Sequence, residues 1–249
     1  MFKEYVSIVK DSLEIIEKEE ASAMNLAAEE IANSIVKDRI IHVFGCGHSH
    51  MMSEEVFYRS GGLVPIHPIF VEDLMLHKGG TRSTLFERMN GYVEDFMTEQ
   101  DIRKGDVVIV VSTSGRNPVP VDVARVSKEK GAYVIGLTSR QASVGQPSRH
   151  EKGRYLYEVV DLVLDNHVTQ GDAVMHDEKH NISFGSISGI LGLTIMNAIV
   201  VEAIQKLIQR GIEPPVFKSG NIDGSDELNK ALINRYKDRI PLLDSLSDK

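Results

Sequence analysis

Short runs of apolar residues, each followed by a turn or a helical pattern, constrain the fold of this chain most strongly. They are rich in Val and Ile, do not alternate with polar residues, and lie within residues 40–45, 106–115, 132–137 and 159–164. Strands of this kind need cover on both faces, as in a parallel sheet between helices. Residues 63–70 predict a fifth strand, which Pro65 and Pro68 place at an edge. The sequence therefore predicts an α/β fold.

Helical patterns frame this sheet at both ends of the chain. Residues 1–38 place apolar side chains three or four apart and predict a helical lead-in, and the tail, residues 211–249, predicts a loop and a short helix capped by Ser225 or Asp226. Residues 182–201 are twenty positions without a charge, about the length of a bilayer crossing. Their serines and Asn197 make them only moderately apolar, so we expect a core helix and no membrane span. No repeat or long linker interrupts the chain, which predicts a single domain over residues 1–249.

Charge and cysteine content narrow the class of protein. The 249 residues include 36 acidic and 28 basic side chains, and the formal net charge of −8 excludes a basic nucleic-acid-binding protein. The single cysteine, Cys46, cannot form an internal disulfide, and the first residues carry charges where a signal peptide needs an apolar stretch. We therefore expect a cytoplasmic protein with a small-molecule ligand.

Two strand-to-helix turns are the expected functional loci, because ligands of open α/β sheets gather at the carboxyl ends of the strands. The first turn, GCGHSH at residues 45–50, combines glycines with a helix start that offers free amides to an anion. It lacks the third glycine of a dinucleotide fingerprint, and the Walker pattern is absent from the chain.

The second turn is rich in hydroxyl groups. Ser112, Thr113 and Ser114 precede Gly115, and Asn117 stands at the predicted start of the next helix. Hydroxyls and helix-start amides together form a neutral phosphate cradle. An ordinary serine-rich helix cap explains the same residues without a ligand.

Taken together, these motifs resemble the sugar isomerase (SIS) domain of phosphosugar isomerases and phosphosugar-binding proteins. The resemblance is carried by FGCGHSH, VVSTSGRNPVPVDVA, DLVLDNHVTQGDA and the uncharged helix from about Ser183. It implies a three-layer α/β/α sandwich with a five-stranded parallel sheet in flavodoxin-like order, assembled as a homodimer or tetramer. It also implies a phosphosugar ligand, with the phosphate held by Ser112, Thr113, Ser114 and Asn117 and the sugar end by Gly47, His48 and Ser49.

Candidates for acid–base chemistry follow from the same resemblance. Isomerisation through an enediol needs a base over the sugar and an acid to open the ring. Glu55 is the preferred base, since helical spacing puts it on one face with Arg59. In phosphoheptose isomerases and muramic acid phosphate etherases a catalytic glutamate lies ten residues after the serine of the first turn, where this chain has Arg59. Arginine cannot act as a base at ordinary pH. Whether this chain uses the mechanism of those enzymes is therefore an open question.

Two further candidates come from other segments. Residues 74–96 resemble the etherase segment that ends in Gly-x-Glu-Asp, which makes Glu94 a second acid–base candidate, although the spacing differs by one residue. His180 is a candidate ring-opening acid. Some phosphoheptose isomerases bind zinc, for which His48, Glu55, His176 and His180 are candidates, but no short ligand spacing such as HExxH is present. We therefore expect no cofactor and no metal, with zinc as the alternative.

Two classes of function remain open. The first is an enzyme, a phosphoheptose isomerase-like sugar-phosphate isomerase or an etherase-like lyase of an amino-sugar phosphate. The second is a noncatalytic sugar-phosphate sensor, which fits the arginine at position 59.

Overall fold

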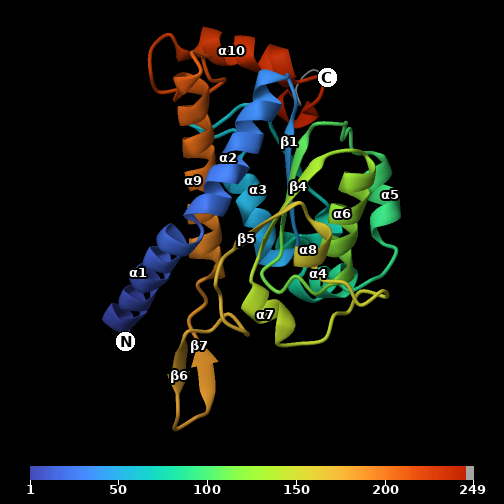
Figure 1. Cartoon of the computed structure of the whole chain (residues 1–249), viewed down its shortest axis with the longest axis vertical. Coiled ribbons are helices and arrows are strands. Elements are labelled where there is room, and N and C mark those ends of the chain that lie inside the picture. The colour runs from blue at the N-terminus through green and yellow to red at the C-terminus, as the bar shows by residue number, and fades with distance from the viewer. Residues whose placement is uncertain (245–249) are drawn as a thin grey trace.

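A computed structural model describes residues 1–244 and contains the predicted parallel sheet (Figure 1). The sheet order is β2-β1-β3-β4-β5 and every neighbouring pair is parallel, so the three-layer sandwich in flavodoxin-like order is confirmed. Residues 245–249 of the predicted tail lie outside the described residues. The five strands are β1 (Ile41–Gly45), β2 (Ile66–Ile69), β3 (Val107–Val111), β4 (Tyr133–Thr138) and β5 (Leu162–Asp165).

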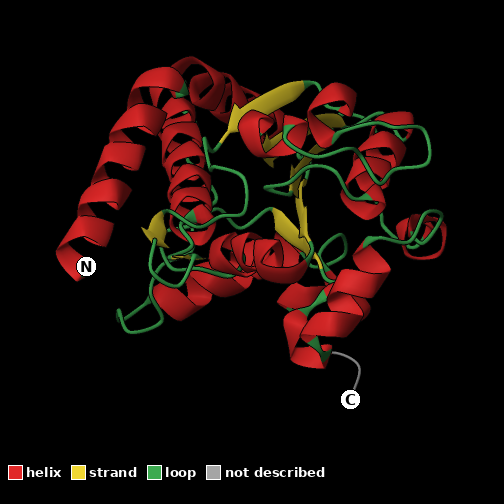
Figure 2. Ribbon diagram, turned by 90° about the horizontal axis from the view of Figure 1, so that it is seen from below, coloured by secondary structure: helices red, strands yellow, loops and turns green. Residues whose placement is uncertain are grey.

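Helices cover both faces of the sheet, as the view along its layers shows (Figure 2). One layer consists of α2, α3 and α9, which pack on one another and on the sheet, and the opposite layer contains α5, α6 and α8. The helices are α1 (Phe2–Glu19), α2 (Ala21–Val36), α3 (Met51–Val56), α4 (Gly80–Glu87), α5 (Val93–Thr98), α6 (Pro118–Glu129), α7 (Arg140–Val144), α8 (Leu156–Val159), α9 (Ser188–Gln209) and α10 (Ser225–Tyr236). Short 3-10 helices span Gly47–His50, Glu72–Leu74, Leu76–Lys78 and Pro241–Leu243.

Strand β3 shows why the sequence runs are continuously apolar. All five of its residues are buried. Val107, Ile109 and Val111 point into the core shared with α2 and α9, whereas Val108 and Val110 point into the core under α6. The two proline residues of the β2 region are tolerated because β2 pairs with β1 alone and therefore lies at an edge, as predicted.

The segment before α9 differs from the predicted helix. Residues 175–177 and 182–184 form an antiparallel hairpin, β6 (Met175–Asp177) and β7 (Ile182–Phe184), which projects from the body (Figure 1). The helix starts later because Asp172 satisfies its first amides, accepting hydrogen bonds from Ile187 N (3.0 Å) and Ser188 N (2.9 Å). Gly185 turns the chain between hairpin and helix with φ of 82°.

Two other predicted helix ends are wrong. Helix α3 ends at Val56 and does not reach Arg59, because Phe57 is extended and Tyr58 has φ of 49°. Helix α10 is preceded by Gly224 in the left-handed region, with φ of 79°, rather than capped by Ser225 or Asp226.

Helix α9 is the core helix that the sequence predicts. Among the described residues it is the only helix long and apolar enough to cross a membrane. Its face with Leu191, Ile195, Ile199 and Ala203 is buried, and it packs along α2 and α3. The apolar composition of α9 is explained by the burial of this face against two helices.

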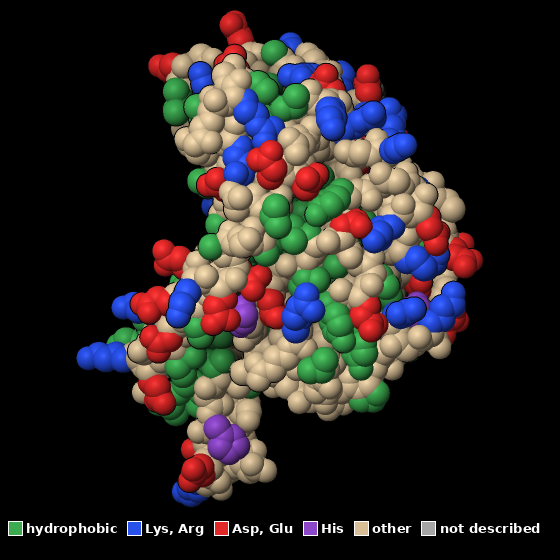
Figure 3. Space-filling view, in the orientation of Figure 1, with side chains coloured by type: hydrophobic (Ala, Val, Ile, Leu, Met, Phe, Trp, Pro, Cys, Tyr) green, Lys and Arg blue, Asp and Glu red, His purple; other side chains and the backbone are tan. Residues whose placement is uncertain are grey.

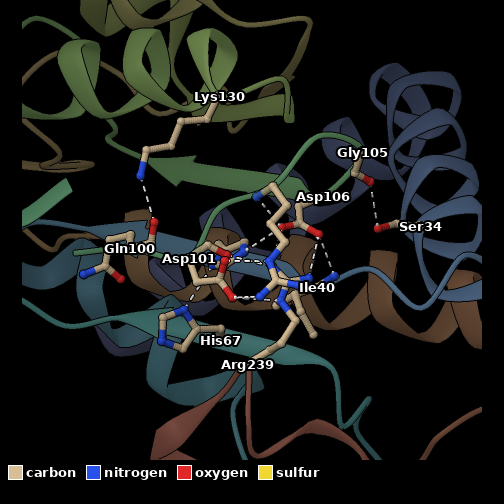
Figure 4. A network of polar contacts seen from close by, with 11 residues as sticks. Ser34, Ile40, His67, Gln100, Asp101, Gly105, Asp106, Lys130 and Arg239 are labelled. Atoms are coloured by element: carbon tan, nitrogen blue, oxygen red, sulfur yellow. Dashed lines mark hydrogen bonds and ion pairs between the residues drawn. The ribbon is translucent and has the colours of Figure 1, made fainter. Parts of the chain in front are cut away.

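A buried polar network lies at the amino-terminal ends of the central strands (Figure 4). The Asp106 carboxylate, just before β3, accepts hydrogen bonds from Ile40 N (3.0 Å) and Arg103 N (2.7 Å), and Arg239 of the C-terminal segment donates to both of its oxygens (3.2 and 2.8 Å). His42 Nε2 lies 3.3 Å from the same carboxylate. These donors hold the pKa of Asp106 far below its usual range although burial opposes the shift.

A histidine pair extends this network. The Nδ1 atoms of His42 and His67 lie 3.0 Å apart, so one ring must donate and the other accept. Burial lowers the pKa of His42, and burial together with the neighbouring His42 lowers the pKa of His67 to about 4. Both rings are therefore neutral in the folded protein near pH 7.

This pair predicts a loss of stability in mild acid. Below pH 6.5 the unfolded chain binds protons that the folded His67 does not bind until about pH 4, so the free energy of unfolding falls across that window. The His67 contribution amounts to about 3 kcal/mol by pH 4. Denaturant unfolding between pH 7 and 4 measures it. The variant His67→Gln should lose less stability over this window, and the exposed His176→Gln should behave like the unmodified chain; equal slopes for all three contradict the assignment.

Candidate functional site

The second turn lies at the carboxyl end of β3 and leads into α6. Gly115 has φ of 56°, and a Cβ there would lie 2.6 Å from Thr138 Oγ1 and 2.9 Å from Ser143 Oγ, so the turn requires glycine. Ser112 Oγ accepts a hydrogen bond from Gly115 N (3.3 Å), which closes the turn. Asn117 precedes α6, but no side-chain hydrogen bond caps this helix. The serine-rich cap is therefore not what these hydroxyls form.

A cleft of about 340 Å³ opens beside this turn. Thr113, Ser114 and Arg116 line one side of it. The other side comes from Ala142 of α7, from Gln146, and from residues 169–172 after β5. The carboxyl ends of β3, β4 and β5 thus supply the walls, as expected for an open parallel sheet.

Arg116 is a site residue that the sequence reasoning missed. Its Nε is buried and has no hydrogen-bond partner among the described residues, and its Nη1 makes one long contact with Gln146 Oε1 (3.4 Å). A buried guanidinium NH without a partner is costly unless a ligand supplies an acceptor. In the sequence, the position of this arginine inside the STSGRN motif was the feature that could have pointed to it.

The first turn lies next to the second, because Gly45 of β1 pairs with Val111 of β3. Its chain folds back so tightly that a Cβ on Gly45 would lie 2.4 Å from Ser49 O. His48 is exposed and Ser49 half-buried, whereas His50 turns inward and contacts Gly47 O and Glu54 (3.4 Å). Gly47, His48 and Ser49 do not line the cleft themselves.

Glu87, the last residue of α4, connects the two turns and was also missed. It is half-buried and hydrogen-bonds to Asn117, and it lies close enough to Cys46 for the two groups to interact electrostatically. Burial raises the pKa of Glu87, opposed by Asn117, Arg88 and Arg149. It occupies the β1/β3 boundary, where the strand order reverses. Its segment was singled out by the etherase resemblance, which pointed to Glu94 instead.

Like Glu87, the three acid–base candidates from the sequence are not among the residues that line the cleft. Glu55 binds Arg59 Nη1 (3.0 Å) and Asn197 Nδ2 (2.9 Å), so both its oxygens are engaged. Glu94 is exposed in the first turn of α5. His180 is exposed in the β6–β7 turn and contacts Asp177 (2.9 Å).

The zinc candidates are not brought together. His176 and His180 lie on the projecting hairpin, and Glu55 lies against α9. Within residues 1–244 no group of three or more His, Cys, Asp or Glu side chains is arranged to hold a metal ion. Cys46 is buried, and burial raises the pKa of its thiol well above the usual value.

Comparison with known proteins places the chain in a family. The family model of the SIS domain matches residues 4–139. A UPF0309 protein from Halalkalibacterium halodurans is 53% identical over 243 residues, which cover 98% of this chain and 97% of the relative. The chain therefore belongs to the SIS domain family, in the group of UPF0309 proteins.

Solved structures agree at the level of the fold. A phosphoheptose isomerase from Neisseria gonorrhoeae has a TM-score of 0.54 at 16% identity, covering 82% of this chain and all (100%) of that protein. A phosphoheptose isomerase from Francisella tularensis has a TM-score of 0.54 at 14% identity, covering 82% and 96% of the two chains. The SIS resemblance drawn from the sequence is thus confirmed.

The geometry of the second turn predicts a strong effect of Gly115→Ala. The substitution forces a left-handed alanine and two contacts under 3 Å, and should cost about 2–4 kcal/mol of folding free energy. Gly153→Ala is the matched control, because Gly153 has φ of 65° but nothing within 4 Å of an added Cβ. It should cost about 1 kcal/mol. Chemical denaturation compares the two, and equal losses would show that the contacts at Gly115 are relieved at no cost.

Proposed function

We propose that this protein binds a phosphorylated sugar in the cleft beside the second turn. The observation that supports it most directly is the buried, unpartnered Nε of Arg116, which stands in the cleft with the hydroxyl-bearing Thr113 and Ser114. A phosphate monoester offers the charged acceptor oxygens that such a guanidinium and hydroxyls bind. Ser112 and Asn117, which the family resemblance assigns to the phosphate, belong to the same turn.

The sugar end is proposed to extend toward the first turn. Gly47, His48 and Ser49 follow β1, the neighbour of β3, so a ligand anchored at the second turn reaches them along the edge of the sheet. The exposed His48 offers a ring nitrogen to sugar hydroxyls.

The proposed reaction is aldose–ketose isomerisation. A base removes a proton from the carbon beside the carbonyl, and the resulting enediol takes a proton back on the neighbouring carbon, so no atoms are lost. We place Glu87 first for this proton transfer, because it lies at the boundary of the two turns and its raised pKa favours a carboxyl that both accepts and returns a proton. Glu55, Glu94 and His180 remain candidates, as does an etherase-like lyase reaction. The proposal uses no metal or other cofactor.

A second candidate function is a sugar-phosphate sensor that does not turn its ligand over. The observation in its favour is Glu55, whose carboxylate is occupied by Arg59 and Asn197. Binding without a free base over the sugar is what a sensor requires.

Assembly and location complete the proposal. We propose a cytoplasmic homodimer or tetramer without nucleic-acid or membrane partners. Cys46 is a buried free thiol, which fits a reducing compartment. Phe2, Phe184 and Ile182 are exposed, and Figure 3 shows apolar side chains gathered where α1 meets the hairpin. Such a patch is typical of a protein interface.

Binding is tested by thermal stabilisation with hexose, heptose, amino-sugar and muramic acid phosphates. A ligand at 100 times its dissociation constant adds about 2.7 kcal/mol to stability. The variant Arg116→Gln should weaken binding of the best ligand roughly 10- to 100-fold, because it removes a charged hydrogen-bond donor. Arg140→Gln, whose guanidinium lies over the Tyr157 ring rather than in the cleft, is the control. Unchanged affinity in Arg116→Gln would remove the main support for the phosphate site.

Turnover of the ligand so identified separates the two functions. Glu87→Gln should lower kcat about 100-fold or more with little change in binding, since it removes the proton-transfer group. Glu55→Gln should change kcat less than about tenfold. Full activity of Glu87→Gln contradicts its role, and tight binding without turnover by the unmodified protein favours the sensor.

A further inference from the structure

A second cleft lies at the opposite end of the molecule, where the C-terminal segment covers the amino-terminal edge of the sheet. Its volume is about 510 Å³. Residues 216–217 pair with residues 61–63 just before β2, and α10 with the segment that follows it packs over this junction through Tyr236 and Ile240. The cleft shares no lining residue with the one beside the second turn.

The loop that forms one wall is held in place. Asn229 of α10 accepts a hydrogen bond from Lys218 N (3.0 Å) and donates one to Lys218 O (2.9 Å). Ser219 then closes a turn with Ile222 N (3.0 Å) and Asn221 N (3.3 Å). These hydrogen bonds fix the backbone from which the Lys218 side chain extends, which lowers the entropic cost of ordering this loop around a ligand.

Two lysine side chains of this cleft are not engaged in ion pairs. Lys218 and Lys230 line it, and neither makes an ion pair within the part of the chain that the structure describes. Two carboxylates, Asp226 and Asp244, also line the cleft, and Asp244 pairs with Lys237 (3.2 Å), which lies outside the lining. Figure 3 shows Lys and Arg side chains interspersed with Asp and Glu at this end of the molecule. The two ammonium groups without an ion pair are the donors that this cleft offers to an anion.

An exposed aromatic ring also lines the cleft. Tyr58 is 58% exposed, and its ring packs edge-on against Phe217 with centroids 5.0 Å apart. Its φ of 49° is unfavourable for a bulky residue and is found mainly where the surrounding structure imposes it. The hydroxyls of Ser60 and Ser219 and the amide of Asn234 also line the cleft. An aromatic face beside hydroxyl and amide groups is suited to a polar ring compound.

We propose that this cleft is a second ligand site, which binds a small ring compound carrying a phosphate group. The phosphate lies between Lys218 and Lys230, and the ring lies on Tyr58. Sugar phosphates and nucleoside monophosphates share this chemistry. Because this cleft shares no lining residue with the one beside the second turn, its occupant is a second ligand and not a part of the first one.

Calorimetric titration of the full-length Arg116→Gln protein tests the site without interference from the first cleft. The probes are glucose 6-phosphate, adenosine monophosphate and inorganic phosphate. One of the two ring compounds should bind at one per chain, and which one binds identifies the class. Adding Lys218→Ala and Lys230→Ala should weaken it about tenfold or more. The control, Lys3→Ala with Lys10→Ala on α1, removes the same charge and should leave the affinity unchanged.

A separate variant tests the ring contact. Tyr58→Asn keeps a residue that tolerates positive φ, so the backbone is preserved while the ring is lost. It should weaken the ring compound and leave inorganic phosphate unaffected. Failure of both ring compounds to bind at about 10 mM, or equal affinity with and without the two lysines, overturns the proposal. These outcomes do not bear on the first cleft, since Arg116 is already replaced.

Discussion

Burial of β3 on both faces is the constraint from which the rest of the structure follows. A strand with all five residues buried needs helices above and below it, so α2 and α9 cover one side and α6 the other. Apolar side chains then occupy both faces of the sheet, and the polar groups discussed above lie at the two ends of its strands. The carboxyl edge holds the two glycine-containing turns, and the amino edge holds the Asp106 network.

Asp106 and Arg116 are buried polar groups at opposite ends of the strands, and they differ in how far they are paired. At the amino edge Asp106 receives two backbone amides, His42 and Arg239, so the carboxylate is satisfied and fixes the C-terminal segment onto the sheet. At the carboxyl edge Arg116 Nε is buried without a partner among the described residues. A satisfied network stabilises the fold, whereas the unsatisfied donor in the cleft supports the proposed ligand site.

Position 59 illustrates how a family comparison is limited by local contacts. The arginine there does more than remove a glutamate from the place that related enzymes use. It binds the carboxylate of Glu55, whose other oxygen is held by Asn197 of α9. The carboxyl that the sequence favoured as base is thereby engaged in helix packing, which is why the proposed proton transfer is assigned to Glu87 instead.

The sequence alone determined the sheet, its edge strand, the two turns and the SIS family, because these depend on local patterns. Apolar runs of β-branched residues encode buried strands, and a proline or glycine acts on its own backbone. The helix ends at Val56 and Ser188 were missed, since Tyr58 backbone geometry and Asp172 capping decide them.

Only the tertiary structure singled out Arg116 and Glu87 as candidate site residues and paired His42 with His67. Burial, an absent partner or a lowered pKa arises when segments distant in sequence meet, as when the tail brings Arg239 to Asp106 across 133 positions. The type of a residue does not by itself tell whether its side chain will be buried, paired or exposed after folding. For that reason the sequence identified the two turns, whereas the packing of α4 and α7 beside them decided which side chains lie next to these turns.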